Sequence, residues 1–431
     1  MIDIKLLRTD LDYCKTAFSK RGIDLREIDE IVDLDLKVRK LMSDLENVKA
    51  KIKSLSKEYA LAKAAGDEAE LSSINESSKN AAQYLDSHQV EFNELKDELN
   101  LRLLYLPNFP ADDCPIGKTS QDNLVLKVVN DGISYSEFQK IPHWEIAEKL
   151  SILDLKNGAK ISGSMFPMYR KAGSKLLRAL TSLALDLHSD IFEEIRPPTF
   201  VKTETMKSTG HLPKFADEAY HMERDDMWAI PTAEVPLTSL GKDEVFKEEE
   251  LPKYMTAVTA CFRREAGAAG SDTRGLLRVH EFDKVEILSY CTKEQSKATH
   301  ELLLERAENI VKILGLKYRV LDLCTGDIGN SSRRTFDIEV YSPGCDKWLE
   351  VSSVSWFGDY QARRANIRYR KKEDSKLELV HTLNGSALAW SRIWPVLIET
   401  GHRIDGTVKL PDVLAKYLND KTVIGLDGNL Q

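Results

Sequence analysis

Residues 261–286 (CFRREAGAAGSDTRGLLRVHEFDKVE) carry a set of side chains that could bind an elongated, charged ligand. Two stretches that favour β-strand flank a polar loop, which predicts a long hairpin. The loop is broken by Gly267, Gly270 and Gly275. On the returning strand Phe282, Lys284 and Glu286 share one face, because side chains alternate along a strand, and Phe282 and Glu286 then lie about 13 Å apart. An aromatic ring at one end and a carboxylate at the other suit a ligand with a base and an amine.

Arginines near this face could supply fixed positive charge, since the planar guanidinium binds phosphate through two hydrogen bonds. The candidates are Arg263, which shares a face with Cys261 on the outgoing strand, together with Arg274 and Arg278. The alternative is a solvated hairpin whose charges face water. These residues alone leave both interpretations open.

Length and composition indicate a protein of two or three domains with ample core, since the chain has 431 residues, of which 42% are hydrophobic. No apolar run approaches 18–20 residues, so no membrane span is expected. The N-terminus is too charged for a signal peptide, and the six scattered cysteines lack metal-ligand spacing. These features predict a cytoplasmic protein with reduced thiols. A net charge of −8 argues against general coating by nucleic acid, so any RNA must be held by local basic patches.

Residues 27–104 predict an antiparallel coiled-coil hairpin. Apolar residues spaced alternately four and three apart form a first heptad seam, which runs through Leu34, Val38, Leu41, Leu45, Val48, Ile52, Leu55 and Tyr59. The run breaks at residues 64–67, and a second seam passes through Leu71, Ile74, Ser78, Ala81, Leu85, His88, Phe92, Leu95 and Leu99. Each helix would be roughly 50–55 Å long. We expect His88 to be a tolerated polar seam residue and not a metal ligand.

Five lysines cluster toward the tip of this arm, at Lys49, Lys51, Lys53, Lys57 and Lys63. They favour contact with a polyanion. A run of charge on a helix is more often a solvated face, and the arm could equally be a dimerisation coil or a spacer. The residues alone do not decide among these functions.

The remainder of the chain predicts an α+β domain with an antiparallel sheet. We expect a first domain over 1–112, a linker over 113–140 and a second domain over 141–431. Predicted strands cover 161–170, 254–263, 281–290, 317–324, 335–341, 347–354 and 362–370, with helices over 173–189 and 293–314 and a last helix from about Ser386. The order lacks strict βαβ alternation, and no glycine-rich phosphate loop is present. A nucleotide would therefore be held by side chains on the sheet.

The hairpin sequence resembles motif 2 of class II aminoacyl-tRNA synthetases, in the form used by bacterial-type seryl-tRNA synthetases. The resemblance extends along essentially the whole chain, in family order, through TGHLPKF (209–215), PTAEVPLT (231–238), LCTGDIG (323–329), YQARRANIRYR (360–370) and HTLNGSALA (381–389). Arg196-Pro197-Pro198 is similar to motif 1, the dimer element. The resemblance implies a cytoplasmic, homodimeric serine–tRNA ligase that uses ATP and Mg²⁺. It also implies that the arm holds the long variable arm of tRNA-Ser, and that tRNA-Sec is charged as well.

The resemblance also implies a role for each matching residue. Arg263 and Arg392 would be catalytic. The ATP site would comprise Arg263, Arg264, Glu265, Arg278, Phe282, Glu350, Val351, Ser352, Ser353 and Arg392. Glu350 and Ser353 would hold Mg²⁺. Serine would be bound by Thr232, Ala233, Glu234, Arg263, Glu286, Asn384 and Ser386.

Four positions depart from the family pattern. Trp356 replaces a usual Asn and Ala387 a usual Gly, while Trp390 and Ser391 replace small residues. We expect Ala387 to start the motif 3 helix near the nucleotide, and the two tryptophans to add bulk close to the site. The predicted enzyme remains active, with ATP geometry or inhibitor sensitivity open to change. The alternatives are a paralogue that activates serine for a carrier protein or serves as a resistance isozyme, and a catalytically impaired tRNA-binding protein.

Overall fold

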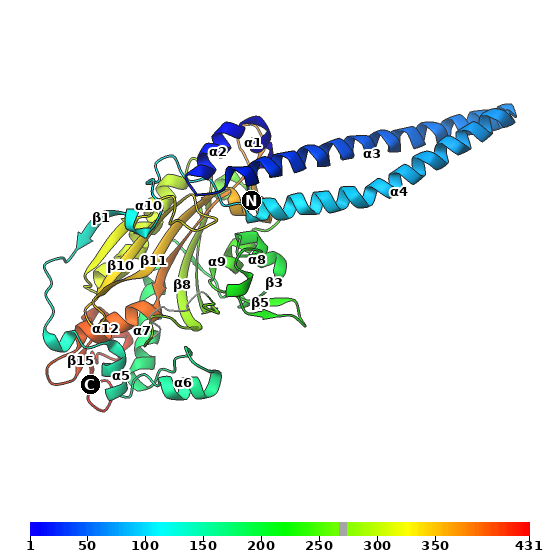
Figure 1. The fold of residues 1–431 in the computed structure, drawn as a ribbon. Coiled ribbons are helices and arrows are strands. Elements are labelled where there is room, and N and C mark those ends of the chain that lie inside the picture. Colours follow the sequence, from blue (N-terminus) through cyan, green and yellow to red (C-terminus); the bar gives the residue numbers. More distant parts are fainter. Residues whose placement is uncertain (267–273) are drawn as a thin grey trace. The chain divides into compact units, whose positions relative to one another are not determined.

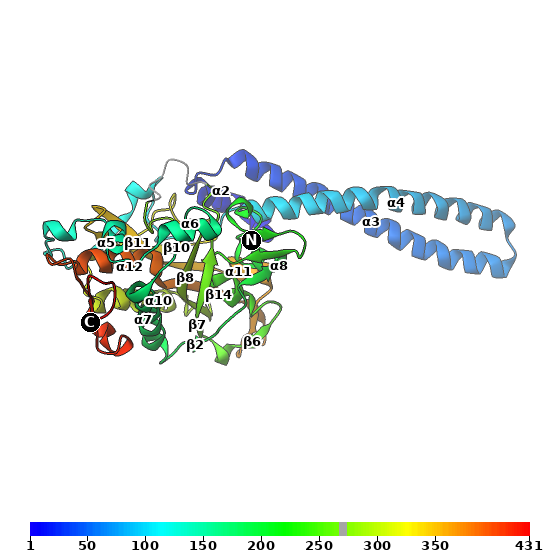
Figure 2. The same cartoon turned by 90° about the horizontal axis from the view of Figure 1, so that it is seen from below.

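The computed structural model describes residues 1–266 and 274–431. The chain divides into two compact units, Ile2–Leu106 and Pro107–Gln431, the latter together with Met1. Figures 1 and 2 show the elements of each unit. Two of the three predicted loop glycines, Gly267 and Gly270, lie outside the described residues. Among the described residues, no helix combines the length and the apolar character needed to cross a bilayer.

The first unit is helical and contains the predicted hairpin. Its helices are α1 (Ile4–Thr9), α2 (Leu11–Ser19), α3 (Leu25–Ala65) and α4 (Glu68–Tyr105). Asp24 caps the start of α3 by accepting from the Arg26 amide, and Gly66 ends the helix in the left-handed region at φ 70°. Asp67 then caps α4, so two residues suffice to reverse the chain. The coiled-coil prediction is confirmed.

The two heptad seams lie between α3 and α4. Leu34, Val38, Leu45 and Leu55 of α3 are buried, as are Ile74, Ala81 and Leu99 of α4. Tyr59, predicted to continue the first seam, is 36% exposed, and Ala62 is instead buried with Leu55 and Ile74 near the tip. His88 stacks on the Tyr84 ring at 3.8 Å and its Nδ1 lies 2.9 Å from the Tyr84 carbonyl, as expected of a tolerated polar residue.

A buried carboxylate ties α1 to the base of α3. Asp35 accepts hydrogen bonds from Arg8, at 2.6 and 2.8 Å, and from Arg39, at 2.9 Å. Burial works to raise the pKa of Asp35, but the hydrogen bonds from both arginines hold it below its ordinary value. The base of the arm is therefore fixed by charge as well as by packing.

The second unit is α+β. Its helices are α5 (His143–Lys149), α6 (Leu155–Ser162), α7 (Lys171–His188), α8 (Thr203–Thr209), α9 (Glu234–Ser239), α10 (Ser296–Ile313), α11 (Tyr360–Ala365) and α12 (Trp390–Gly401). Its strands are β1 (Leu124–Val129), β2 (Glu193–Glu194), β3 (Phe200–Lys202), β4 (His221–Met222), β5 (Met227–Ala229), β6 (Val245–Lys247), β7 (Lys253–Phe262), β8 (Glu281–Cys291), β9 (Tyr318–Asp322), β10 (Arg334–Ser342), β11 (Lys347–Gly358), β12 (Arg368–Arg370), β13 (Leu377–Leu379), β14 (His381–Ala389), β15 (Val408–Lys409) and β16 (Val423–Ile424).

An eight-stranded sheet organises this unit, in the order β1-β9-β10-β11-β14-β8-β7-β2. Its strand pairs are antiparallel except β2 with β7. Val285 and Ile287 of β8 pack into one core with residues of α7, α10 and α12 on one face of the sheet. Leu288 and Tyr290, on the opposite face, pack with α9 and α11. These small helices cover only part of that face, and Figure 1 shows the sheet and its labelled neighbours.

Three predicted elements are wrong. Residues 161–170 are not a strand: α6 occupies Leu155–Ser162, started by the Asp154 side chain, which accepts from the Asn157 amide. The predicted strand 362–370 begins inside α11, and only Arg368–Arg370 is extended. Ser386 does not begin a helix, because pairing with β8 keeps the chain extended to Ala389 and α12 starts at Trp390. The remaining predicted helices and strands agree with the structure within a few residues.

Candidate active site

Two adjoining cavities lie over the open face of the sheet. We call the first the arginine cavity, lined by Arg263, Glu265, Leu277, Arg278, Val279, Phe282, Lys284, Glu350, Val351, Ser386, Ala389, Ser391 and Arg392. The second, of about 230 Å³, is the carboxylate cavity; among its lining residues are Thr209, His211, Thr232, Glu234, Arg263, Lys284, Glu350, Ser353, Asn384 and Ser386. Arg263 and Glu350 line both, so a single ligand could occupy the two cavities at once.

Strand pairing between β7 and β8 places the Phe282 ring at the floor of the arginine cavity. Cys261 lies opposite Phe282 in the ladder, and Arg263 follows directly after β7. The Arg263 guanidinium lies over the Phe282 ring, 5.3 Å from its centroid. A cation stacked on an aromatic ring is stabilised in place. The backbone of Arg263 is held by its amide, which donates to the His280 carbonyl at 3.0 Å.

Three guanidinium groups converge on this cavity. Arg278 forms an ion pair of 2.7 Å with Glu265, and Arg392 projects from the first turn of α12. Burial lowers the pKa of Arg392; the charges of Arg263 and Arg278 lower it further, against an opposing effect of Glu350. So much unbalanced positive charge in one place favours a polyanionic ligand such as a phosphate chain.

A β-bulge in β11 brings two oxygen ligands onto the same face. In a regular strand Glu350 and Ser353, three residues apart, would point to opposite faces. The ladder to β10 pairs Glu339 with Glu350 and Ile338 with Ser352, which leaves Val351 as the extra residue. Glu350 and Ser353 therefore both reach the site face, while Ser352 pairs with core residue Ile338 on the helical face.

Asp337 of β10 adds a third oxygen group, because it lies opposite Ser353 in the ladder. Burial, and then the negative charge of Glu350, hold the pKa of Asp337 well above its ordinary value, although a hydrogen bond from Ser353 lowers it. Its Oδ1 atom is buried and accepts no hydrogen bond from a described residue. Carboxylate and hydroxyl oxygens of this kind are the ligands preferred by hard divalent cations.

The carboxylate cavity is built on a closed network of buried polar side chains. Glu286 is completely buried; it accepts from Thr232 Oγ1 at 2.7 Å and from Asn384 Nδ2 at 3.1 Å, and it pairs with Lys284. Asn384 Nδ2 also donates to Glu234 Oε2 at 2.9 Å. Two carboxylates, an amide and a hydroxyl thus surround a small polar space, which suits an ammonium group and a hydroxyl group of a ligand.

Glu234, one of the two carboxylates of this network, has a perturbed pKa. Burial, and then the negative charge of Glu286, raise the pKa of Glu234 to about 7. Gln361 Nε2 donates to Glu234 Oε1 at 2.6 Å and favours its charged form. Near neutral pH Glu234 therefore shares its time between the protonated and the charged form, and a cationic ligand would favour the charged one.

Sequence reasoning missed three residues of this cavity. The strand alternation puts Lys284 on the correct face without indicating a role; its Nζ donates to Thr232 Oγ1 at 2.8 Å and pairs with Glu286. Gln361 fixes Glu234, as above. His211 is half-buried beside Thr209, and loss of solvation, with the positive charge of Arg263 and Lys284, lowers its pKa to about 3. His211 and Gln361 stand in two of the segments that resemble the family, which was the available signal.

Most predicted site residues come together, and a few do not. The cavities collect the predicted ATP and serine residues except four, Ala233, Arg264, Ser352 and Glu286; of these, Glu286 accepts hydrogen bonds from the lining residues Thr232 and Asn384. Arg264 points toward the Tyr220 ring, at 5.9 Å, and Ala233 is buried in the core beside α9. Arg274, a candidate for phosphate binding, instead lies over Trp144 at 5.2 Å.

Three of the four residues that depart from the family pattern lie outside both cavities. Ala387 is not at a helix start: it is the extra residue of a second bulge, between Ser386 and Leu388 in β14, and it is buried in the core. Trp356 Nε1 donates to His381 at 3.3 Å, and Trp390 lines a separate surface cavity with Arg196 and Asp283. Of the four unusual residues only Ser391 lines the arginine cavity.

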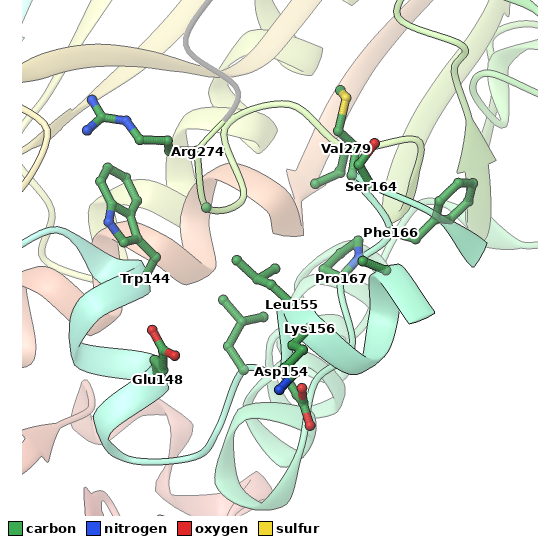
Figure 3. A pocket seen from close by; sticks show the side chains of 14 residues that line it. Trp144, Glu148, Asp154, Leu155, Lys156, Ser164, Phe166, Pro167, Arg274 and Val279 are labelled. Atoms are coloured by element: carbon green, nitrogen blue, oxygen red, sulfur yellow. The ribbon is translucent and has the colours of Figure 1, made fainter. Parts of the chain in front are cut away.

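A larger cavity, of about 460 Å³, lies on the other side of residues 274–279. Figure 3 shows Trp144 below the Arg274 guanidinium on one side, with Leu155, Phe166, Pro167 and Val279 on the other. Val279 is the one lining residue that it shares with the arginine cavity among the described residues. Its charged lining residues, Glu148, Asp154, Lys156 and Arg274, include neither the three converging arginines nor the buried carboxylate network of the two cavities above, so size alone does not mark the active site.

Comparison with known proteins gives concordant results for both units. Residues 217–401 match the tRNA synthetase class II core domain (G, H, P, S and T), and residues 1–110 match the seryl-tRNA synthetase N-terminal domain. The serine–tRNA ligase of Geobacillus kaustophilus is 42% identical over 426 residues, covering 98% of this chain and 100% of the relative. That of Fervidobacterium nodosum is 43% identical over 419 residues, covering 97% and 98%.

Two solved structures are similar over nearly the full length. The seryl-tRNA synthetase of Pyrococcus horikoshii, complexed with ATP, has a TM-score of 0.89 at 32% identity and covers 98% of this chain and 99% of its own. The cytoplasmic serine–tRNA ligase of Naegleria fowleri, in complex with AMP, has a TM-score of 0.82 at 25% identity and covers 98% of each chain.

Proposed function

The chain belongs to the seryl-tRNA synthetase family of class II aminoacyl-tRNA synthetases, and we propose that its two cavities divide the family's substrates between them. The activity is that of a serine–tRNA ligase, which joins serine to its tRNA at the expense of ATP. In our proposal the arginine cavity takes ATP and the carboxylate cavity takes serine. The position of Arg263, which lines both, is the observation that carries this division.

In the arginine cavity, adenine stacks on Phe282, and Glu265 accepts from its amino group. Arg278 and Arg392 hold the terminal phosphates, which match the positive charge gathered there. Arg278 is paired with Glu265 at 2.7 Å, so it is already directed toward the cavity before a nucleotide binds. Arg263 grips the α-phosphate, where the reaction takes place.

In the carboxylate cavity, Glu234 and Glu286 receive the ammonium and the hydroxyl of serine, with Thr232, Asn384 and Ser386 around them. Glycine and alanine lack the hydroxyl and would leave these buried polar partners unpaired, which is a severe penalty. Threonine adds only a methyl group and must be rejected by steric contact. Selection against the smaller amino acids should therefore be the stronger.

The first reaction needs no nucleophilic side chain. The serine carboxylate oxygen attacks the α-phosphorus; a bond between them forms as the bond from the α-phosphorus to the bridging oxygen breaks, and pyrophosphate leaves with that electron pair. In the second reaction a ribose hydroxyl at the 3′ end of the tRNA attacks the acyl carbon and loses its proton; the ester bond forms as the bond from the acyl carbon to the phosphate oxygen breaks, and AMP leaves. Arg263 contributes by aligning carboxylate and α-phosphate and by stabilising the charge shared between them.

Glu350 and Ser353 fit a Mg²⁺ ion, with Asp337 close behind them. The support is the all-oxygen donor set that the bulge at Val351 directs to one face, together with the buried, unpartnered Asp337 Oδ1. When bound, the ion would neutralise phosphate charge. Its place would lie at the boundary of the two cavities, where Glu350 lines both.

We also propose that the arm binds the long variable arm of tRNA-Ser, and by the same contact tRNA-Sec. The support is the exposure of all five predicted lysines on α3, whose charge suits backbone more than base contacts. We further propose that the protein forms a homodimer through the motif 1-like residues 196–198 and that it is cytoplasmic. These finer statements follow from the family.

Serine-dependent exchange of pyrophosphate into ATP tests the proposed site. We expect exchange with serine, weak exchange with threonine and none with alanine or glycine. Exchange independent of serine, or equal exchange with alanine, would contradict the assignment of the carboxylate cavity. The impaired tRNA-binding alternative loses its support because three of the four unusual residues lie outside both cavities.

A further inference from the structure

A buried histidine, His143, contacts the returning limb of the hairpin loop behind the arginine cavity. The Leu276 amide donates to His143 Nε2 at 3.1 Å. A backbone amide can only donate, so Nε2 is the unprotonated ring nitrogen. The ring proton therefore resides on Nδ1, which donates to Glu399 Oε1 at 2.9 Å. His143 thus links the loop to Glu399 of α12 through both of its nitrogens.

Glu399 is held in turn by four further donors, one of them the Cys345 thiol, whose Sγ lies 3.7 Å from Oε1. Its Oε1 accepts from the His143 amide at 3.1 Å, and its Oε2 accepts from Ser342 Oγ at 2.5 Å and from the Gly344 amide at 3.1 Å. The side chains of His143 and Glu399 are both completely buried. A buried carboxylate with every oxygen hydrogen-bonded is fixed in position, so it offers the imidazole a rigid partner.

This cluster is not a metal site. His143, Cys345 and Glu399 place possible ligand atoms within 4.8 Å of one another. Both nitrogens of His143 and both oxygens of Glu399 are already used in hydrogen bonds, however. Burial, and then the charge of Glu399, raise the pKa of Cys345 to about 11, so its sulfur stays a thiol. The cluster is therefore structural in its chemistry.

The neighbouring glycine shows how closely the loop approaches the ring. Gly275 has φ 63°, a conformation that side chains disfavour, and a β-carbon there would lie 2.4 Å from His143 Nε2 and 2.6 Å from Trp144. Arg274, one residue earlier, lies over the Trp144 ring, as Figure 3 shows. Residues 274–276 are thus fitted against the start of α5.

The link connects the two arginines proposed to hold the terminal phosphates. Arg278 lines the arginine cavity and follows Leu276 by two residues. Glu399 follows Arg392 by seven residues on the same helix, about 10 Å along its axis. The path from Arg278 through Leu276, His143 and Glu399 to Arg392 thus consists of two short covalent segments joined by two hydrogen bonds.

We propose that His143 is a positioning residue that sets the separation of Arg278 and Arg392, and through it the affinity for ATP but not for serine. This inference rests on the proposed function of the arginine cavity. The carboxylate cavity draws none of its lining residues from this link. Loosening the link should therefore act on one substrate alone, which general destabilisation would not do.

The test compares His143→Phe with His188→Phe in the full-length protein, by ATP–pyrophosphate exchange. His188 is a suitable control because it is buried and neither ring nitrogen has a hydrogen-bond partner among the described residues. We expect His143→Phe to raise the KM for ATP at least tenfold and to leave the KM for serine within twofold. His188→Phe should change neither. His143→Gln, which retains an acceptor for the Leu276 amide, should recover most of the ATP affinity.

Hydrogen–deuterium exchange of the peptide that contains Leu276 provides a readout other than activity. Its amide should lose protection in His143→Phe and keep it in His188→Phe. If His143→Phe does not fold, Gly275→Ala forces the loop off the ring with the His143–Glu399 pair intact, and it should show the same effect on ATP.

Four outcomes would overturn the inference: an unchanged KM for ATP in His143→Phe or, where it is needed, in Gly275→Ala; equal rises in KM for both substrates; no recovery with His143→Gln; or unchanged protection of Leu276. Absence of serine-dependent exchange in the unmodified protein would instead contradict the proposed function itself.

Discussion

Replacing Arg263 with alanine removes the one guanidinium among the described residues that lines both cavities. In our proposal it makes charge-assisted hydrogen bonds to the α-phosphate and to the serine carboxylate, each worth about 1.5–3 kcal/mol. If both hydrogen bonds form in the transition state, the variant loses about 3–6 kcal/mol of transition-state stabilisation. At about 1.4 kcal/mol per tenfold, kcat for ATP–pyrophosphate exchange should fall about 10²- to 10⁴-fold.

The same variant should fold normally. The Arg263 side chain is exposed; its one aromatic contact among the described residues is the Phe282 ring, and its backbone hydrogen bonds to His280 survive in alanine. Loss of an exposed cation–π contact costs about 0.5–1 kcal/mol, so Tm should fall by only a few degrees. Arg264→Ala is the matched control, because Arg264 lines neither cavity; its exchange should stay within about threefold. Exchange by Arg263→Ala within tenfold of the unmodified protein, or an equal loss in Arg264→Ala, would refute this assignment.

Three further predictions follow from the arm, from Ala387 and from Glu234. Replacing residues 41–95 with a short glycine–serine linker should leave exchange within twofold and abolish charging of tRNA-Ser; surviving charging would mean that the arm has another role. Ala387→Gly should lower the free energy of unfolding by about 1 kcal/mol, from loss of a buried methyl group and gain of chain entropy, and leave the KM for ATP unchanged; a severalfold change in that KM would place Ala387 at the nucleotide after all. The folded-state pKa of Glu234, about 7, lies above the ordinary value of 4.5, so the folded state keeps a proton that the unfolded chain releases, and the free energy of unfolding falls as pH rises between these values. Glu234→Gln should flatten this part of the curve of Tm against pH. Parallel curves for the variant and the unmodified protein would contradict a raised pKa of Glu234.

Local patterns were sufficient to predict the arm and the floor of the site. The two heptad seams predict the two helices, and Gly66 and Asp67 between them mark the turn. The two-residue period of β8 placed Phe282, Lys284 and Glu286 on one face, where the structure has them. Each of these features depends on neighbours in sequence, so a single sequence reveals it.

The features that were missed depend on contacts between distant segments. The bulges at Val351 and Ala387 arise from the register of β11 with β10 and of β14 with β8, which no local pattern reports. They turn Glu350 toward the site and Ala387 away from it. The link from His143 to Glu399 spans 256 residues and could not be read from either segment. The strand predicted over 161–170 overlaps the end of the helix at Leu155–Ser162, although Asp154 is a local signal for the start of that helix.

A crystal structure with a non-hydrolysable seryl-adenylate analogue would test the division of the two cavities most directly. The account predicts adenine against Phe282, the phosphate mimic beside Arg263, and the serine hydroxymethyl group among Thr232, Glu286 and Asn384. An analogue bound instead in the cavity beside Trp144, or a reversed orientation with the serine end at Phe282, would contradict it.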